Sequence, residues 1–246
     1  MEIEAETKKN SLENMFKVGA HYGYSKSRRH PSVKSFIYGT KNRTEIIDLD
    51  QVYGLLLKAR EFVSTLAVNG KQILFSGNKP EAKESVLSTA VALGMPYSKE
   101  RWIGGTLTNF SEIKKRVARL EELKSKKQAG ELNIYTKKER AILDKEIASL
   151  ERFFDGLVKM KSLPAAIFLV DPKKESTAVR EAKRMRLPII ALAGSDCDIS
   201  QIEYPIVAND ASRSSIKFFV DEIASAYREG KEKENGNNGS DQKSTG

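Results

Sequence analysis

Runs of consecutive apolar residues recur along the chain and are separated by longer segments of mixed polarity. The runs occupy residues 72–75, 166–170 and 189–192, and residues 44–48 form a weaker one. Short runs without polar alternation are typical of strands whose two faces are both buried. The pattern therefore predicts three interior strands of a sheet, with residues 44–48 as a further candidate.

Helix signals lie between these runs. Asp50 is placed to cap a helix that extends to about residue 68, and Pro80 and Gly94 suit the first turn and the end of the next helix. Further helices are expected over about 174–186 and from residue 209 or 210 to 228. Strands that alternate with helices and are buried on both faces predict an α/β fold. We expect a doubly wound, mainly parallel sheet of the Rossmann or flavodoxin type.

Residues 111–161 depart from this alternation. Apolar residues recur there at alternating spacings of four and three, before and after a polar turn at 128–133. This spacing is the seam of two helices that pack as a coiled coil. Thr136 and Glu139 have the spacing of a capping box at the start of the second helix. The segment is predicted to be an inserted antiparallel helical hairpin.

The two ends of the chain lack such patterns. Residues 1–13 are acidic and are expected to be a flexible lead-in, and residues 231–246 are polar without an apolar anchor and are expected to be disordered. The α/β domain is then formed by residues 14–110 and 162–230, on either side of the hairpin.

Composition narrows the class of protein further. Hydrophobic residues make up 39% of the 246 residues, which is enough for a core and excludes general disorder. The longest apolar run, Ala165–Val170, is far shorter than the roughly 20 residues of a membrane-spanning helix. The acidic N-terminus has no apolar segment of a presequence, and the single cysteine, Cys197, suits a reducing compartment. We therefore expect a cytoplasmic protein without a membrane partner.

The net charge of +9 is concentrated near the N-terminus. Residues 14–43 hold seven basic side chains and no acidic one, and a surface segment normally intersperses both signs. A concentrated basic segment is typical of proteins that contact nucleic-acid phosphates, and the alternative is a merely solvated loop. We expect these side chains to become ordered on RNA, because no acid within the segment neutralises them: Lys17, Lys26, Arg28, Arg29, Lys34, Lys41 and Arg43.

Catalytic motifs are missing from the sequence. The histidines, His21 and His30, both lie in the basic segment, with no acid nearby to orient either ring. Residues 77–84 follow a strand and open a helix as a phosphate loop does, but Ala82 replaces its second glycine and Glu84 its Ser/Thr. A tight strand–helix turn is the better interpretation, and we expect neither an enzyme nor a bound cofactor.

Two clusters allow a functional and a structural interpretation. Asp196, Asp198, Asn209 and Asp210 follow strands and could converge on a magnesium ion in the crevice of a doubly wound sheet. The structural interpretation, which we favour, is that they form turns and helix caps.

The second cluster is the segment 101–110, which contains the only tryptophan and two glycines before a helix start. Trp102 suits a core position, whereas Arg101 and the glycine-rich approach to a helix suit a phosphate. Both interpretations remain open on the residues alone.

Several motifs in register resemble the bacterial ribosomal protein S2 family. They are Gly19–Gly23, Pro31–Gly39, Arg43–Leu49, Phe75–Lys79 and, most specifically, Arg101–Asn109, and the resemblance extends from about Met15 to Arg228. The chain departs from the family pattern at Tyr24, usually a second histidine, within residues 193–199, at Val207 and at Ala211. These departures fall at the crevice, so a metal typical of the family is not carried over.

The resemblance implies a structural constituent of the small ribosomal subunit, in the cytoplasm. Family members contact small-subunit ribosomal RNA and neighbouring small-subunit proteins, and in bacteria they help to dock ribosomal protein S1. A protein-interaction module that uses the hairpin is the rival interpretation. The expected RNA-binding residues are Lys17, His21, Lys26, Arg28, Arg29, Lys34, Lys41, Arg43, Arg101, Asn109, Lys114 and Lys115.

Overall fold

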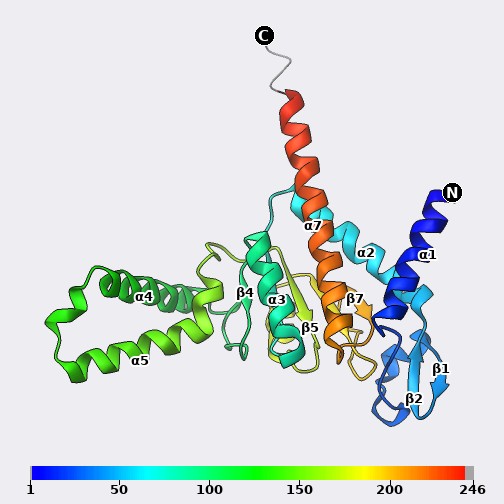
Figure 1. The fold of residues 1–246 in the computed structure, drawn as a ribbon, viewed down its shortest axis with the longest axis horizontal. Coiled ribbons are helices and arrows are strands. Elements are labelled where there is room, and N and C mark those ends of the chain that lie inside the picture. Colours follow the sequence, from blue (N-terminus) through cyan, green and yellow to red (C-terminus); the bar gives the residue numbers. More distant parts are fainter. Residues whose placement is uncertain (1, 242–246) are drawn as a thin grey trace.

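A parallel sheet of five strands forms the centre of the molecule (Figure 1). The computed structural model describes the backbone of residues 2–241 and the side chains of residues 5–234. The strand order is β4-β3-β5-β6-β7, and every neighbouring pair is parallel. The strands are β3 (Ile73–Ser76), β4 (Tyr97–Ser98), β5 (Ala166–Val170), β6 (Ile189–Ala193) and β7 (Tyr204–Val207).

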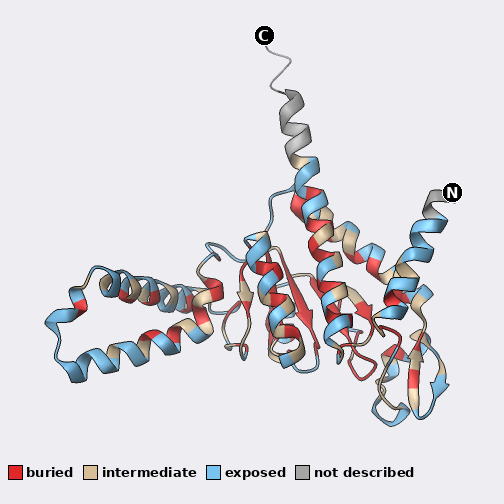
Figure 2. Ribbon diagram, viewed as in Figure 1, coloured by how far each residue is buried: buried red, intermediate tan, exposed pale blue. Residues whose placement is uncertain are grey.

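Both faces of this sheet are covered, as the unbroken apolar runs predict. Alternate side chains of a strand point to opposite faces, and Phe75 and Phe168 lie in one apolar cluster while Leu74 and Ile167 lie in the other. Figure 2 shows the buried residues concentrated on the sheet and on the inner faces of its helices. The expected doubly wound α/β fold is confirmed.

Four helices cover the two faces. The first cluster is completed by α2 (Leu49–Val68), α3 (Pro80–Leu93) and α7 (Arg213–Asp241). The second is completed by α6 (Ser176–Arg184), by residues around Trp102 and by the base of the helical hairpin. Pro80 opens α3 and Gly94 ends it with φ of 69°, as expected. Asp48 rather than Asp50 caps α2, because the Asp48 carboxylate accepts the Asp50 N–H at 3.0 Å.

The helical hairpin consists of α4 (Phe110–Gln128) and α5 (Lys137–Phe154), followed by the 3-10 turn η4 (Asp155–Leu157). The capping box of Thr136 and Glu139 is present at the start of α5. The hairpin projects sideways from the sheet with exposed outer faces (Figures 1 and 2). Its base is not separate from the body, because Phe154, Leu157 and Met160 share an apolar cluster with Leu74 of the sheet.

The N-terminal segment is a helix, which corrects the expectation of a flexible lead-in over residues 1–13. Helix α1 spans Glu2–Lys17, and residue 1 lies outside the described part. Met15 is fully buried at the end of α1, and Lys8 forms a 2.8 Å ion pair with Asp50 of α2. These two anchors give an otherwise polar helix its tertiary support.

The C-terminal helix also continues beyond its expected end at residue 228. Within the segment 231–246 that we expected to be disordered, residues 231–241 belong to α7, and residues 242–246 lie outside the described part. Gly230 explains the extension, since a Cβ at this position would lie 2.5 Å from the Ser64 carbonyl oxygen of α2. Close packing against α2 supports the part of α7 that extends beyond the sheet.

A small antiparallel hairpin follows α1 and carries part of the basic segment. It is formed by β1 (Ile37–Lys41) and β2 (Thr44–Ile47), and Asn42 and Arg43 at its turn have positive φ angles of 50° and 65°. The 3-10 helices η1 (Lys26–Arg28) and η2 (Pro31–Phe36) precede it. Among the described residues, no helix is long and apolar enough to cross a membrane.

Candidate nucleic-acid interface

The basic segment is fixed against the carboxyl-terminal edge of the sheet. Tyr24 N–H donates to the Ser195 hydroxyl at 2.8 Å, and His30 N–H donates to the Ser195 carbonyl at 2.9 Å. On its other side, Gly23 N–H donates to the Glu45 carbonyl at 2.9 Å. Ser195 follows β6, so these bonds attach the segment to the end of an interior strand. The expectation that the segment becomes ordered only on RNA is therefore wrong.

Two of its arginines have acidic partners that the sequence did not reveal. Arg28 lies 3.0 Å from the Asp196 carboxylate, and Arg29 lies 2.9 Å from the Glu45 carboxylate. The Glu45 side chain is 0% exposed, and its second oxygen is buried without a hydrogen-bond partner. The prediction that nothing neutralises these arginines fails because Glu45 stands just beyond the acid-free segment and Asp196 is brought in by the fold.

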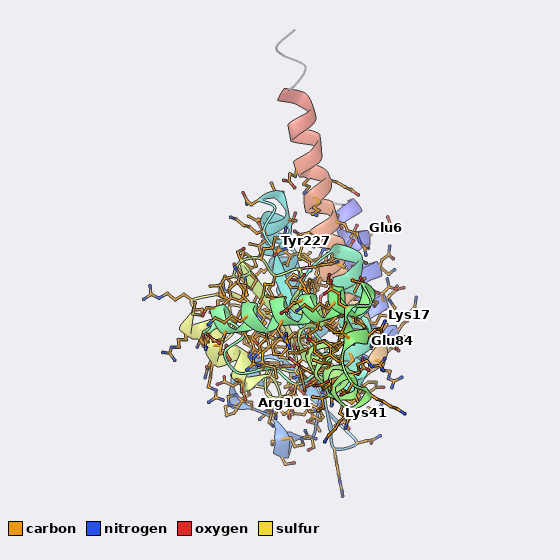
Figure 3. The ribbon with its side chains drawn as sticks, turned by 90° about the vertical axis from the view of Figure 1, so that its left-hand side faces the viewer. Glu6, Lys17, Lys41, Glu84, Arg101 and Tyr227 are labelled. Atoms are coloured by element: carbon orange, nitrogen blue, oxygen red, sulfur yellow. The ribbon has the colours of Figure 1, made fainter. Side chains whose placement is uncertain are left out.

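The other cations of the segment remain accessible. Five of them are exposed and form no ion pair within the described part of the chain, and Figure 3 labels two of these side chains. Two of the five lie at the β1–β2 turn. We refer to this set as the N-terminal basic patch: Lys17, Lys26, Lys34, Lys41 and Arg43.

The two histidines have structural roles. The His21 ring is buried and stacks on Phe16, with ring centroids 4.5 Å apart and planes 10° apart. Its centroid lies 4.1 Å from that of Tyr22, whose ring is tilted by 41°. Burial lowers the pKa of His21, so the ring is neutral at pH 7. His30 caps η2 through Ser32, and its Nδ1 lies 3.8 Å from the Asp198 carboxylate. The segment 14–43 offers no acid to either ring, but the fold brings Asp198, which lies outside the segment, close to His30.

The segment 101–109 and the start of α4 carry a second group of accessible polar side chains. Arg101 and Asn109 are exposed, Lys114 lies 5.0 Å above the Phe110 ring, and Lys115 pairs with Glu112. Asn109 is the N-cap residue of α4 but makes no side-chain capping bond. We refer to this set as the loop patch: Arg101, Asn109, Lys114 and Lys115.

The N–H groups of the glycine-rich loop donate hydrogen bonds to a carboxylate of the protein itself. Trp102 is a core residue at 6% exposure, and its indole N–H donates to Glu181 of α6 at 3.1 Å. The same carboxylate accepts the N–H groups of Gly105, Leu107 and Thr108 at 2.8, 2.9 and 3.2 Å. These are the N–H groups that a phosphate would need. The core interpretation of Trp102 is confirmed, and the phosphate seat is filled by Glu181.

Side chains of the protein itself also fill the crevice at the carboxyl-terminal edge of the sheet. The Lys79 ammonium lies 3.0 Å from both the Asp171 and the Asp210 carboxylates, and all three side chains are buried. Burial alone would lower the pKa of Lys79, but Asp210 and Asp171 raise it above its usual value. Asn78 N–H in turn donates to Glu175 at 3.0 Å. The loop after β3 therefore turns its lysine and an N–H group inward, which disfavours a phosphate-loop role.

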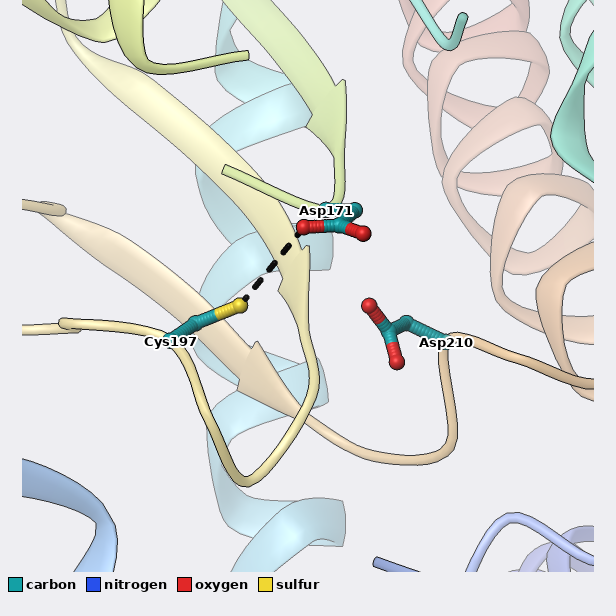
Figure 4. A group of neighbouring side chains, drawn as sticks. All are labelled: Asp171, Cys197 and Asp210. Atoms are coloured by element: carbon teal, nitrogen blue, oxygen red, sulfur yellow. Dashed lines mark hydrogen bonds between the residues drawn. The ribbon is translucent and has the colours of Figure 1, made fainter. Parts of the chain in front are cut away.

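A metal site among these residues has weak chemical support. Asp171, Cys197 and Asp210 lie close enough together to share an ion (Figure 4). Burial raises the pKa of Cys197 to about 12, so its sulfur is a thiol at pH 7 rather than the thiolate that binds metals. A cation there would also have to displace the Lys79 ammonium from both carboxylates.

The remaining acids of the predicted magnesium cluster have local partners. Asp196 pairs with Lys173 at 2.9 Å as well as with Arg28, and Asp198 accepts the N–H and hydroxyl of Ser200. Asn209 accepts the Ala211 N–H at 3.0 Å ahead of α7. For Asp198 and Asn209, the turn interpretation is confirmed.

Fold and surface together describe a basic α/β protein with an exposed patch suited to nucleic-acid phosphates and a crevice in which Lys79 pairs with two carboxylates. A family model described as ribosomal protein S2 matches residues 15–230. The chain is 40% identical to the small ribosomal subunit protein uS2 of Mycobacteroides abscessus, over 95% of this chain and 84% of that protein. The chain belongs to the ribosomal protein S2 family.

Two further relatives carry the same description. The uS2 protein of Desulforapulum autotrophicum is 40% identical over 94% of this chain and 83% of its own length. That of Nocardia farcinica is 40% identical over 89% of this chain and 77% of its own length. The protein is thus a structural constituent of the small ribosomal subunit in the cytoplasm, as the sequence motifs indicated.

Proposed function

We propose that the N-terminal basic patch is the main contact of this protein with small-subunit ribosomal RNA, and that the loop patch is a second contact. The observation that carries this proposal is the exposure of five cations, without acidic partners among the described side chains, on a backbone fixed at both sides. A backbone that is already fixed does not have to be ordered when the side chains bind phosphates. Arg29 and His21, which we expected to touch RNA, act instead as parts of the framework.

The mechanism is architectural. Lysine and arginine contacts to phosphates set the position of the protein, and recognition is of folded RNA shape rather than of duplex base edges. Arg28 retains a share in this contact, because its side chain is 55% exposed although it is paired with Asp196.

The proposal is tested with two double variants that each remove two lysines, one variant in the N-terminal basic patch and one in α7. Lys26→Ala with Lys34→Ala should weaken binding to small-subunit ribosomal RNA and reduce the slope of log affinity against log salt by about 1–2, since each phosphate contact contributes up to ~0.9. Lys231→Ala with Lys233→Ala removes the same charge from exposed positions of α7 and should change little. Equal shifts in both double variants would show that the N-terminal basic patch is not the contact.

Two finer statements complete the proposal. We infer that the protein has no catalytic turnover, which is supported by the inward-facing Lys79 and the buried neutral ring of His21. Incubation of the rigorously purified protein with nucleotides tests this inference, and sustained release of phosphate would contradict it. We also infer that ribosomal protein S1 is among the neighbouring proteins, which is supported only by the family resemblance. Co-sedimentation of S1 with small subunits that carry or lack this chain tests that partner.

A further inference from the structure

The Glu181 carboxylate is the most heavily hydrogen-bonded side chain of the loop patch region. It accepts hydrogen bonds from the Trp102 indole, from three backbone N–H groups and, at 3.3 Å, from the Thr108 hydroxyl. All five donors come from residues 102–108, whereas Glu181 belongs to α6 and is only 8% exposed. One side chain of a different element therefore accepts hydrogen bonds from four residues of the loop.

The electrostatics keep this carboxylate charged. Burial raises the pKa of Glu181, but the N–H groups of Leu107 and Gly105, the Trp102 indole and the Thr108 N–H outweigh burial and hold the pKa below its usual value. A carboxylate that accepts several N–H groups is stabilised in its ionised form. At neutral pH the loop is thus bound to a full negative charge.

The loop also has local supports: the Asn109 N–H donates to the Gly105 carbonyl at 2.8 Å, and Trp102, Thr106 and Leu107 are buried. Gly105 adopts φ of 92°, a left-handed conformation that favours glycine, and the Thr106 hydroxyl donates to the Ile103 carbonyl at 2.6 Å. The loop ends at Asn109, the N-cap residue of α4, without a side-chain capping bond. Glu181 adds to these local contacts a connection from α6 to the residues that lead into α4.

We propose that Glu181 is a positioning residue for RNA binding, which holds the 102–108 loop so that the loop patch is presented in one fixed arrangement. The inference rests on the proposed function of the loop patch. Arg101 lies directly before the loop, and Lys114 and Lys115 lie in the first turns of the helix that follows it. Because Glu181 occupies the N–H groups, RNA contacts in this region come from side chains whose spacing the loop sets.

The substitution Glu181→Gln removes the negative charge but keeps the size of the side chain. The glutamine amide offers one acceptor oxygen, and its NH₂ group faces N–H donors instead of accepting from them. Buried N–H groups left without an acceptor destabilise the native loop. Glu181→Gln should therefore raise amide hydrogen exchange at Leu107 and Thr108, or at Gly105, while exchange in β5 and β6 stays slow.

The decisive experiment is a double-mutant cycle on RNA affinity. Arg101→Ala should reduce the salt slope by about 0.9, as expected for one lost phosphate contact. Glu181→Gln should reduce it by at least as much, and adding Arg101→Ala to Glu181→Gln should reduce it little further. Such non-additivity is expected only if Glu181 acts through the loop patch.

Glu175→Gln is the matched control. Glu175 is a buried carboxylate immediately before α6, but it accepts the Asn78 N–H of a different loop. Burial raises the pKa of Glu175 to about 7, so glutamine there resembles a form that the native protein already populates. This variant should leave the RNA salt slope unchanged.

The outcomes separate the two proposals. If alanine at Arg101, Lys114 and Lys115 leaves RNA affinity unchanged, the loop patch itself is wrong. If these variants weaken binding but their effects add fully to that of Glu181→Gln, Glu181 has no positioning role and that inference is overturned. Should Glu181→Gln fail to fold, Glu181→Asp takes its place, since it keeps the charge and shortens the reach. Full RNA affinity in a folded Glu181→Asp protein whose loop amides exchange rapidly would also overturn the inference.

Discussion

At the scale of single residues, the ion pair of Arg29 and Glu45 ties the basic segment to the β1–β2 hairpin. The Arg29 side chain is 20% exposed and the Glu45 side chain is fully buried. Arg29→Ala should leave a buried carboxylate without its partner and lower the free energy of unfolding by about 3–5 kcal/mol. Urea denaturation followed by circular dichroism measures this change.

Lys34→Ala is the reference for that measurement, because Lys34 is exposed and forms no ion pair among the described side chains. Its stability should stay within about 0.5 kcal/mol of the native protein. If Arg29→Ala proved as stable as Lys34→Ala, the Arg29–Glu45 pair would not be the tie that the geometry indicates.

The candidate site was only partly predictable at this scale. The exposed lysines could be named from sequence, because an acid-free basic segment is visible without any knowledge of folding. The partners of Arg28 and Arg29 could not, since Asp196 is distant in sequence and meets Arg28 only at the sheet edge. Glu181 could not be predicted as a site residue, because nothing in its local sequence indicates that it holds a loop 73–79 positions away.

At the scale of elements, the helical hairpin divides into a distal part and a base. Across its seam, Lys127 pairs with Asp144 and Arg119 with Glu146. Replacing residues 121–149 with a short glycine-rich linker should leave the α/β body cooperatively folded, because loop-closure cost grows slowly with length. Thermal unfolding and solubility measure the outcome.

The complete deletion is the contrasting variant. Removing residues 111–161 takes away Phe154, Leu157 and Met160, which cover the sheet face that includes Leu74. We expect this deletion to be much less stable than the distal one, because it exposes apolar surface that the hairpin base buries. Loss of cooperative unfolding already in the distal deletion would mean that the whole hairpin is part of the core.

Elements that bury a continuous face could be predicted, and elements supported by a few contacts could not. The interior strands and the hairpin carry periodic apolar patterns and appear where those patterns predict them. Helix α1 has no such pattern, and the burial of Met15 and the Lys8–Asp50 pair depend on the position of α2. The extension of α7 depends likewise on the fit of Gly230 against α2.

At the scale of the whole molecule, the two patches flank one edge of the sheet. Parallel strands end at the same edge, and the loop patch follows β4 at one end of the strand order, while the basic segment is attached after β6 near the other. Figure 1 shows the helical hairpin and the β1–β2 hairpin on opposite sides of the sheet. The two RNA contacts that we propose therefore lie apart, near opposite ends of the strand order.

Separated contacts make a quantitative prediction. Substitutions at distant sites without shared partners have additive effects, within about 0.3–0.5 kcal/mol. Combining Lys26→Ala and Lys34→Ala with Arg101→Ala should thus reduce the RNA salt slope by the sum of the separate reductions. Filter-binding titrations over a range of salt concentrations measure these slopes. A combined reduction no larger than that of either set would indicate one shared contact.

The buried Lys79 has a consequence for the magnesium-rich surroundings in which ribosomal RNA folds. Its ammonium lies between Asp171 and Asp210. The counterion of these two carboxylates is therefore a side chain of the protein rather than a dissolved ion. Two neighbouring buried carboxylates would otherwise recruit a dissolved cation or repel a nearby phosphate. With the charge supplied from within, this edge of the sheet keeps its shape whether magnesium is abundant or chelated. Magnesium can then act on the RNA during assembly without changing the shape of this part of the protein.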